Sequence, residues 1–481
     1  MKQIITGLKE KRLKYGISQS KLAKLYGLSP ASLSAWELGK IQPSRMQLEQ
    51  WIASLNDLVK LVETKKIDIR KKKILTTKSV KKSNAIEVSD SNSYRKIVGN
   101  LKRKETEYTK SINEVYARHL TNENVGELRA ISLFSGCGGL DLGFSAAGFS
   151  ILGHIELDKS IEEIYRANFP CSITLGYDIT QITDEEITSW KNRFGEIDII
   201  LGGPPCQGFS LAGKRNPEDE RNKLYEYYAK ILRIVQPKVF VMENVSLLTS
   251  MRAKDGNLVI ENIKNEFSKS GYSMAIKEID VKQYGVPQSR NRIIIVGTRN
   301  GEMTFKHPEP SHCDPNADDD MYYGLFDNLR RRPYRTFRDA THDLPIIESG
   351  ETSDDPLHWG VTHPKHVIEW LQDVPEGCSA HDNENPALRP SSGFNTTYKR
   401  VKWDEPCSTI STNFGMISGS RNVHPSSTRA FSVREAARIQ SFSDNFIFLG
   451  NWSAIRKAIG NAVPPLFAYY LANAVRNQLF R

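Results

Sequence analysis

Short apolar runs alternate with segments of helical periodicity from residue 130 onward. The apolar runs predict β-strands over residues 130–134, 151–155, 197–201, 239–242 and 293–296. Because strands that alternate with helices form a parallel sheet with both faces covered, the pattern predicts an α/β fold. We expect a doubly wound, mixed and mostly parallel sheet.

The pattern breaks down between residues 301 and 428. This region is rich in proline, holds most of the chain's ten histidines and contains stretches such as DPNADDD and NENPALRPSSG. It is predicted to form a separate, irregular domain. Its histidines and Cys313 lack the spacing of metal ligands, so no metal site is expected there.

The first 55 residues carry three short helical patterns separated by glycines. The first contains Ile5, Leu8 and Leu13, the second spans residues 18–27, and the third spans residues 29–39. Two short helices joined at a glycine match the plan of a helix-turn-helix. A three-helix bundle used for protein contacts is the alternative.

Residues 56–128 are polar and basic, and their composition predicts a basic linker with one helix near residues 100–119. Residues 1–128 contain 26 lysines and arginines against 13 aspartates and glutamates, whereas the rest of the chain contains 40 against 43. This concentrated positive charge indicates an anionic partner such as nucleic acid, although a solvated charged segment fits equally well.

The sequence gives little indication of a membrane span, a signal peptide or a disulfide framework. No apolar run approaches the roughly 18 residues of a membrane span, and the N-terminus lacks an apolar signal core, so we expect a cytoplasmic protein. The six cysteines show no CxxC spacing, which argues against a disulfide framework or a structural zinc site. A cysteine with a function should then be a free thiol.

A glycine-rich turn follows the first predicted strand, in the segment ISLFSGCGGLDLGF. Such a turn alone can serve tight packing only. Glu156 ends the second predicted strand about twenty residues later, where a carboxylate is placed to bind a ribose diol. The two features together predict a site for a nucleoside cofactor.

The segment IDIILGGPPCQGFS carries the strongest single signal for catalysis. Its buried strand ends in two glycines and two prolines that would hold Cys206 in a fixed pose at the carboxyl edge of the sheet, where sites of α/β proteins lie. A rigid, accessible thiol suits a nucleophile, and a buried structural cysteine is the alternative.

The next strand ends in Glu243, with Asn244 beside it. A carboxyl group at the end of an apolar strand is suited to donate a proton to a ring nitrogen, and a helix N-cap is the alternative. Gln288, Arg290 and Arg292 occupy alternate positions in YGVPQSRNRIIIVG. Alternation would place them on one face, where guanidinium groups can pair with a carboxylate and a base carbonyl.

In this order, the motifs resemble those of the DNA (cytosine-5) methyltransferase family over residues 129–481. The resemblance implies a Rossmann-like, S-adenosylmethionine-dependent fold with a catalytic domain over 129–300 and a target-recognition domain over 301–455. A segment over 456–481 would return to complete the catalytic domain. Cys206 would be the nucleophile, Glu243 the group at cytosine nitrogen 3, and Arg290 and Arg292 the stabilisers of that carboxylate and of the base carbonyl.

The resemblance also implies binding residues. The cofactor pocket would contain Phe134, Gly136, Gly138, Gly139, Glu156, Asp178, Ile179, Pro205, Leu224 and Asn461. Target DNA would contact Ser210 and Arg221 of the loop that closes over a flipped-out cytosine, together with Gln288, Thr409 and Ile410. The segment TRAFSVREAARIQSF, with Arg438 and Gln440, would brace the recognition domain. The sequence departs from the family pattern at Tyr177, which separates Gly176 from Asp178, and at Ser443, where proline is usual.

Residues 4 to about 55 resemble the helix-turn-helix domain of phage-repressor and Xre-type regulators. In that family the helix after the turn enters the major groove. Ala31, Ser32 and Ala35 would then face bases, with Gln19 and Lys40 near phosphates. These short side chains cannot make the bidentate contacts that discriminate bases strongly, so the operator cannot be read.

We therefore expect a sequence-specific DNA cytosine-5 methyltransferase that protects DNA from a cognate restriction endonuclease and represses its own promoter. Its partners would be target DNA, bound as a monomer, and an operator, bound through the helix-turn-helix domain with dimerisation left open. The alternatives are a DNA-binding regulator with an inactive methyltransferase body and an RNA cytosine-5 methyltransferase.

Overall fold

A computed structural model describes most of the chain. The described residues are 2–14, 22, 30–38, 42–43, 48, 51–52, 55–56, 59, 90–101, 105–120, 127–205, 223–253, 256–299, 301, 305–314, 331–419 and 421–480. The chain divides into two compact units. The larger unit comprises residues 87–344, 404–413 and 433–481, and the smaller one residues 1–86, 345–403 and 414–432.

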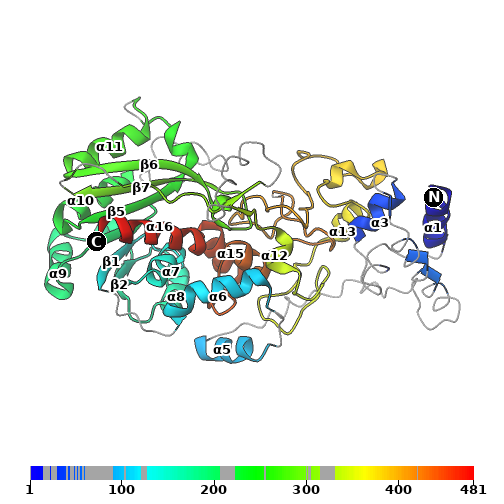
Figure 1. The fold of residues 1–481 in the computed structure, drawn as a ribbon, viewed down its shortest axis with the longest axis horizontal. Coiled ribbons are helices and arrows are strands. Elements are labelled where there is room, and N and C mark those ends of the chain that lie inside the picture. Colours follow the sequence, from blue (N-terminus) through cyan, green and yellow to red (C-terminus); the bar gives the residue numbers. More distant parts are fainter. Residues whose placement is uncertain are drawn as a thin grey trace. The chain divides into compact units, whose positions relative to one another are not determined.

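A seven-stranded sheet in the order β3-β2-β1-β4-β5-β7-β6 forms the centre of the larger unit (Figure 1). Strand β7 runs antiparallel to both of its neighbours, whereas the pairs among β1 to β5 are parallel. The strands are β1 (Leu128–Leu133), β2 (Phe149–Ile155), β3 (Ile173–Gly176), β4 (Ile199–Gly202), β5 (Val239–Val245), β6 (Tyr272–Asp280) and β7 (Asn291–Arg299). This topology confirms the predicted doubly wound, mostly parallel sheet.

Helices cover both faces of this sheet (Figure 1). Helices α9, α10 and α11 pack against one face, while α7 and α16 pack on each other and cover the opposite face. The helices of the larger unit are α5 (Ser91–Gly99), α6 (Glu107–Leu120), α7 (Gly139–Ala146), α8 (Lys159–Asn168), α9 (Asp184–Phe194), α10 (Leu224–Val235), α11 (Val259–Lys269), α12 (Phe337–Thr341), α14 (Val433–Ile439), α15 (Trp452–Asn461) and α16 (Pro465–Leu479). None of the described helices is long and apolar enough to cross a membrane.

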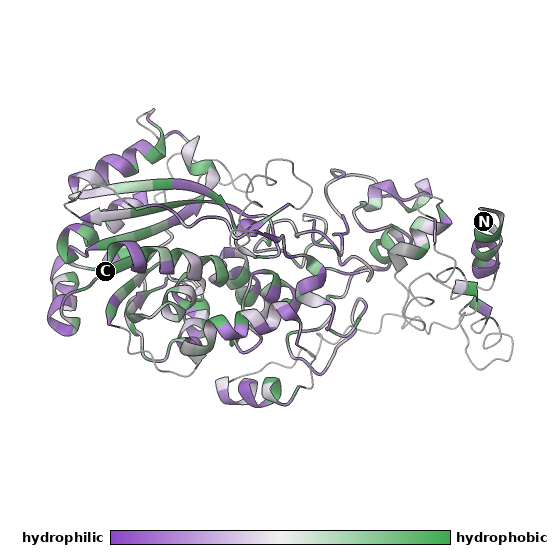
Figure 2. Cartoon of the chain, in the orientation of Figure 1, coloured by the Kyte–Doolittle hydropathy of each residue, from purple (hydrophilic) through white to green (hydrophobic). Residues whose placement is uncertain are grey.

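The hydrophobic core follows the pleat of the strands. Ile131, Ile200 and Phe240 are aligned across β1, β4 and β5, and their side chains pack with α10 and α11. Ile199 and Val241 lie one position away along their strands and are equally buried on the opposite face. Figure 2 shows the central strands as mostly hydrophobic and the covering helices as mixed. Burial on both faces explains why these strands read as continuous apolar runs.

All five predicted strands are present, each within a few residues of its predicted bounds. Strands β3 and β6 were not predicted. Both lie at edges of the sheet, where β3 is only half-buried along its four residues and β6 exposes Lys277 and Glu278. An edge strand lacks the continuous apolar run that identifies a central one.

The N-terminal segment contains α1 (Lys2–Lys14) and α3 (Pro30–Glu37), which correspond to the first and third predicted helices. Ile5, Leu8 and Trp36 join one core cluster as predicted. Leu13 does not, because it is exposed, and Arg12 of the same helix is buried in a two-point ion pair with Glu37 at 2.7 and 2.8 Å. The second predicted helix lies outside the described residues except for position 22, which is helical.

Residues 345–403 and 414–432 have little regular structure, in agreement with the predicted irregular domain. Their longest helix is α13 (Lys365–Leu371), and a small apolar cluster around Leu371, Ile417 and Val423 forms their core. The predicted recognition boundaries of 301 and 455 differ from the structural division, since residues 301–344, 404–413 and 433–455 belong to the larger unit.

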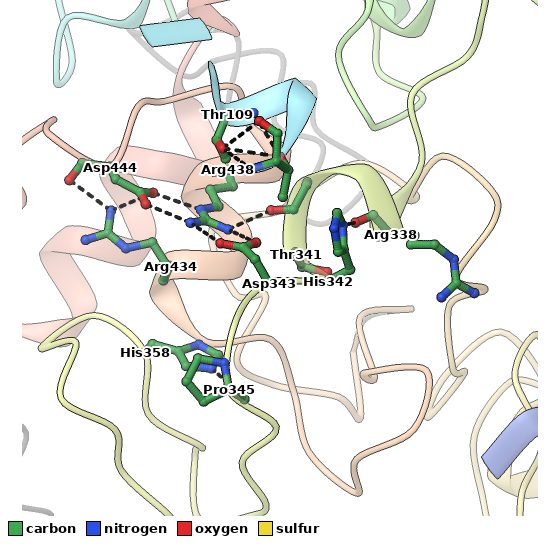
Figure 3. A network of polar contacts seen from close by, with 12 residues as sticks. Thr109, Arg338, Thr341, His342, Asp343, Pro345, His358, Arg434, Arg438 and Asp444 are labelled. Carbon is green, nitrogen blue, oxygen red and sulfur yellow. Dashed lines mark hydrogen bonds and ion pairs between the residues drawn. The ribbon is translucent and has the colours of Figure 1, made fainter. Parts of the chain in front are cut away.

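Arg438 explains part of this difference. Its guanidinium group lies between the carboxylates of Asp343 and Asp444, with hydrogen bonds of 2.6 to 3.1 Å (Figure 3). It also donates to the carbonyl oxygen of Ala340 at the end of α12. Residues 340–343 and 438–444 are thereby fixed together inside the larger unit.

The predicted linker also differs from the structure. Residues 91–99 and 107–120 form α5 and α6, and the second of these covers most of the helix predicted near 100–119. Their tyrosines Tyr94, Tyr108 and Tyr116 are buried in the larger unit. The stretch is too polar overall to suggest a core element, because each helix buries only one narrow face.

Candidate active site

The glycine-rich turn after β1 has a backbone that most side chains disfavour. Phe134, Gly136 and Gly138 have φ angles of 54°, 57° and 89°. For Phe134 this left-handed conformation is strained, and such strain persists where the surrounding structure fixes the residue, as it does at functional sites. A Cβ atom at Gly139 would overlap the carbonyl oxygen of Val463, so the turn lies directly against the segment that precedes α16.

Glu156 ties this turn to the end of β2. Its two carboxylate oxygens accept hydrogen bonds from the backbone N–H groups of Gly136 at 2.8 Å and Asp158 at 2.9 Å. Burial raises the pKa of Glu156, while these two N–H groups oppose the shift. The prediction that the glycine turn and Glu156 share one site therefore has the required geometry.

The remaining predicted cofactor residues are spread over four segments. Asp178 accepts hydrogen bonds from the backbone and hydroxyl of Thr180 at 2.9 and 2.7 Å, and the neighbouring Ile179 is buried. Pro205 and Leu224 are partly buried. Asn461 is exposed at the last position of α15.

The carboxyl ends of β4 and β5 lie side by side. Glu243 is almost wholly buried, and a Cβ atom at Gly203 would lie 3.2 Å from its Oε2 atom, so glycine allows the carboxylate to approach the chain after β4. Asn244 donates from Nδ2 to the carbonyl oxygen of Pro204 at 3.0 Å. Glu243 and Asn244 of β5 thus lie against the Gly203–Pro205 segment that leads to position 206.

Arg292 is the charged partner of Glu243. Its Nε atom lies 2.8 Å from Glu243 Oε1, and both side chains are largely shielded from solvent. Glu243 Oε1 receives no hydrogen bond from the described residues, so the contact is an ion pair whose N–H is not aimed at the oxygen. This pair agrees with the predicted association of Arg292 with Glu243.

Arg290 lies near the Glu243–Arg292 pair and also binds backbone on other segments. It is buried and donates to the carbonyl oxygens of Ile410 at 3.1 Å and Gly460 at 2.9 Å. Burial lowers the pKa of Arg290 well below its usual value, with a further contribution from Arg292. The charge of Glu243 acts on Arg290 in the opposite direction, so Arg290 lies near both members of the Glu243–Arg292 pair, and it also fixes backbone segments around the site. Its role toward the carboxylate and the base carbonyl stays a prediction.

Gln288 and Ile410, which were predicted to contact DNA, are buried inside the protein. Gln288 donates to the carbonyl oxygen of Ile439 and to Gln440, and its Oε1 accepts from the backbone of Ile410 at 3.1 Å. Both residues therefore make intramolecular contacts in place of the predicted DNA contacts. Thr409 is exposed, with its hydroxyl bound to the carbonyl oxygen of Ser289 at 2.8 Å.

Several predicted site residues lie outside the part of the chain that the structure describes. These are Cys206, Ser210, Arg221, Gln19 and Lys40, together with the side chains of Ala31 and Ser32. Ala35 is half-buried on α3. The buried tyrosines of α5 and α6 were not predicted, although Tyr108, Ile112 and Tyr116 recur at helical spacing, which indicates a packed face.

Comparisons with known proteins agree with this geometry. Residues 128–477 match the C-5 cytosine-specific DNA methylase family, and residues 8–57 match a helix-turn-helix family. The Type II methyltransferase M1.HphI of Haemophilus parahaemolyticus is 36% identical over 352 residues, which cover 72% of this chain and 86% of that protein. The Type II methyltransferase M.DdeI of Desulfomicrobium norvegicum is 31% identical over 72% of this chain and 88% of its own length.

Among solved structures, one described as a prophage-encoded DNA modification methyltransferase of E. coli superposes with a TM-score of 0.55 at 25% identity. The match covers 74% of this chain and all of that one. The family match over residues 128–477 includes all seven strands of the central sheet and the adjacent carboxyl ends of β4 and β5. The chain belongs to the C-5 cytosine-specific DNA methylase family and carries a helix-turn-helix domain at its N-terminus.

Proposed function

We propose that this enzyme uses Cys206 and Glu243 to methylate carbon 5 of a cytosine in duplex DNA. The observation that carries the proposal is the Glu243–Arg292 ion pair against the Gly203–Pro205 segment. A buried carboxyl group beside the segment that leads to Cys206 suits protonation of a base that the thiol attacks.

The residues around the glycine turn fit S-adenosylmethionine. Gly136 is left-handed and has open space where a Cβ atom would lie, which leaves room for a close ligand, and Glu156 is held at the carboxyl edge where a ribose diol would be bound. Asp178 and Ile179 would lie at the adenine, with Phe134, Gly139, Pro205, Leu224 and Asn461 completing the pocket. When bound, this cofactor supplies an electrophilic sulfonium methyl group.

The protein's own part is to make carbon 5 of cytosine nucleophilic. The Cys206 thiolate adds to carbon 6 of the ring while Glu243 gives a proton to nitrogen 3, so that electron density moves to carbon 5. After methylation, loss of the carbon 5 proton to a base, departure of the Cys206 thiolate and return of the nitrogen 3 proton to Glu243 restore the aromatic ring and the enzyme. Arg292 holds Glu243 in place, and Arg290 positions the 410 and 460 segments.

Attack at carbon 6 is not possible within a stacked duplex, so the target cytosine must be flipped out of the helix. Ser210 and Arg221 would belong to the loop that closes over it, and exposed Thr409 would face DNA. Recognition of the target sequence would come from the irregular segments 345–403 and 414–432.

Three variants test this chemistry by transfer of a labelled methyl group to duplex DNA. Cys206→Ala should abolish transfer, and Glu243→Gln should lower kcat by about a hundredfold to ten-thousandfold, the usual contribution of a general acid. Cys171→Ala, which alters an exposed cysteine, is the matched control and should leave kcat unchanged. Wild-type protein should also form a covalent adduct with 5-fluorocytosine duplex; a Cys206→Ala protein that methylates would refute the proposal.

The helix-turn-helix domain supports a second activity, repression of the gene's own promoter. The match over residues 8–57 and the excess of basic residues before residue 128 both favour an operator contact. Deletion of residues 1–55 should raise output from a promoter reporter, whereas Cys206→Ala should repress as wild type does. Unchanged output after the deletion would exclude repression.

The relatives named Type II methyltransferases also suggest pairing with a restriction endonuclease. DNA from cells that express this protein should carry 5-methylcytosine at one short sequence. That DNA should resist an endonuclease which cuts the same sequence when it is unmethylated. Scattered methylation without a common sequence would contradict the pairing.

A further inference from the structure

Three buried tyrosines attach α5 and α6 to the rest of the larger unit. The hydroxyl groups of Tyr94, Tyr108 and Tyr116 donate to the carbonyl oxygens of Phe446 at 3.0 Å, Arg438 at 3.0 Å and Ser441 at 2.9 Å, respectively. Residues 90–120 lie outside both family matches, which end at residue 57 and begin at residue 128. We refer to residues 90–120 as the docked arm.

The arm binds the backbone at the end of α14 and in the loop that follows it. Residues 438–446 comprise the end of α14 and the following loop, where helix carbonyl groups need donors from elsewhere. Ser441 is a non-glycine residue with a φ of 65°, a conformation that its surroundings must hold. Tyr116 supplies one of those constraints, because its buried hydroxyl donates to the Ser441 carbonyl oxygen at 2.9 Å.

The residue before Ser441 extends the connection toward the cofactor turn. Gln440 donates from Nε2 to the carbonyl oxygens of Ile459 at 2.7 Å and Ala462 at 3.0 Å. These carbonyls flank Asn461, and Val463 lies against Gly139 of the glycine turn. Tyr116 is therefore connected through Ser441 and Gln440 to the wall of the proposed cofactor pocket.

His119 of α6 makes a second contact with the elements around the glycine turn. His119 of α6 lies 3.0 Å from the Ser145 hydroxyl of α7, and its ring packs on Phe169 with centroids 4.7 Å apart. A Cβ atom at Gly138 would overlap the Phe169 ring. The arm thus contacts both the helix that begins at the glycine turn and the aromatic ring beneath that turn.

We propose that the docked arm is part of the catalytic unit and that Tyr116 is a positioning residue for the cofactor. In this proposal Tyr116 holds Ser441, so that Gln440 keeps the Ile459–Val463 segment against the glycine turn. The proposal rests on the proposed use of S-adenosylmethionine at that turn.

Tyr116→Phe in the full chain removes one hydroxyl and keeps the ring. It should raise the KM for S-adenosylmethionine about fivefold, the equivalent of one net hydrogen bond, and leave kcat within about twofold. Tyr94→Phe is the matched control. Its carbonyl partner is Phe446, five residues beyond Ser441 and outside the connection through Ser441 and Gln440, so its KM should stay at the wild-type value.

A measurement on the wild-type chain tests the proposal without any variant. Because coupling between two sites is reciprocal, S-adenosylmethionine should slow hydrogen exchange in residues 107–120 as well as in residues 136–139. Protection of 136–139 alone, or an unchanged KM in Tyr116→Phe, would overturn the role of the arm. Wild-type protein that neither binds S-adenosylmethionine nor methylates DNA would instead refute the proposed function.

Discussion

The central sheet and the irregular segments 345–403 and 414–432 satisfy their backbone hydrogen bonds in different ways. In the sheet, residues 239–245 of β5 all pair with β7, and apolar side chains fill both faces. In the irregular segments, buried Arg400 donates to the carbonyl oxygens of Leu371, His424 and Ser427 at 2.6 to 2.8 Å. In these segments a guanidinium group supplies the hydrogen-bond donors that a neighbouring strand supplies in the sheet.

The same solution recurs elsewhere in these segments. Arg429 donates to the carbonyl oxygens of Ile347 and Ala430, and the ring of His358 bridges Ser432 and Pro345. Buried carbonyl groups need partners whether or not a strand lies beside them, and arginine offers five donors. The sheet should therefore be sensitive to side-chain volume, and the irregular segments to loss of donors.

Acidification should cause the largest effect and should affect the larger unit most. Burial lowers the pKa of His119, His154, His307 and His312 to about 4, and among the irregular segments it does so for His363. Unfolded histidines titrate near 6.5, so the stability is present above that pH and is lost as pH falls toward 4. The total loss between pH 7 and 5 should be on the order of 5 kcal/mol.

Asp141 acts in the opposite direction. Burial raises its pKa to about 7, so the folded protein binds its proton more tightly than the unfolded chain does and stability falls as pH rises from about 4 to 7. One carboxyl group cannot offset four imidazoles. Hydrogen exchange at pH 5 and 7 should show greater loss of protection in the sheet than in residues 345–403; equal loss would contradict the assignment.

Arg400→Ala should cost about 3 to 5 kcal/mol, because it leaves three buried carbonyl groups without their donor and opens a cavity. Arg400→Lys should cost less but still destabilise, since an ammonium group cannot reproduce the planar fork. Denaturant unfolding measures both. Protection from exchange should fall in residues 371–427 and persist in β4 and β5.

The exposed Arg421 provides the control within the same segment. Arg421→Ala should change the unfolding free energy by no more than about 0.5 kcal/mol. If Arg400→Ala were equally mild, the irregular segments would not depend on buried donors.

Gly297→Ala tests the sheet. Gly297 lies opposite Phe240 in the β5–β7 pair, and an added Cβ atom would overlap the Phe240 ring. Overpacking of this kind should cost about 1 to 3 kcal/mol. Phe240→Leu in the same chain should relieve the clash, so that the double variant is less destabilised than the sum of the two single variants. Strict additivity would show that volume is not the limiting factor.

The smallest effect should come from an exposed ion pair. Arg338 and Asp404 form two hydrogen bonds at 2.6 and 2.9 Å, and the contact with Arg338 lowers the pKa of Asp404. Solvent exposure should limit Arg338→Ala to about 1 kcal/mol or less. The loss should shrink further in high salt, and a large, salt-independent loss would show that this pair resembles the buried donors.

The same contrast explains what could be predicted from the sequence. The five central strands were identified because burial on both faces produces apolar runs, and Glu243 and Arg292 meet because the end of β5 lies beside the start of the antiparallel β7. The additional contacts of Arg290 with the carbonyl oxygens of Ile410 and Gly460 were not predicted, because both acceptors are backbone atoms of distant segments. Arg400 was not recognised, since a buried arginine and a surface arginine look alike in a sequence.

The docked arm was interpreted as a linker for a related reason. Its three tyrosines lie among many polar residues, and their partners are backbone carbonyl groups more than 300 positions away. Carbonyl groups carry no sequence signal. The helical spacing of Tyr108 and Tyr116 predicts a buried face but not the surface that covers it.

The packing of α16 on α7 has a consequence for protein synthesis. Gly143 of α7 lies so close to Ala468 that a Cβ atom would overlap it, so the helix after the glycine turn is completed by residues 465–479. A ribosome adds about 5 to 20 residues per second, which places α16 on the order of 20 to 80 s after residue 57. The helix-turn-helix segment therefore leaves the ribosome long before α16 can pack on α7, and a nascent chain presents that segment while the methyltransferase domain is still incomplete.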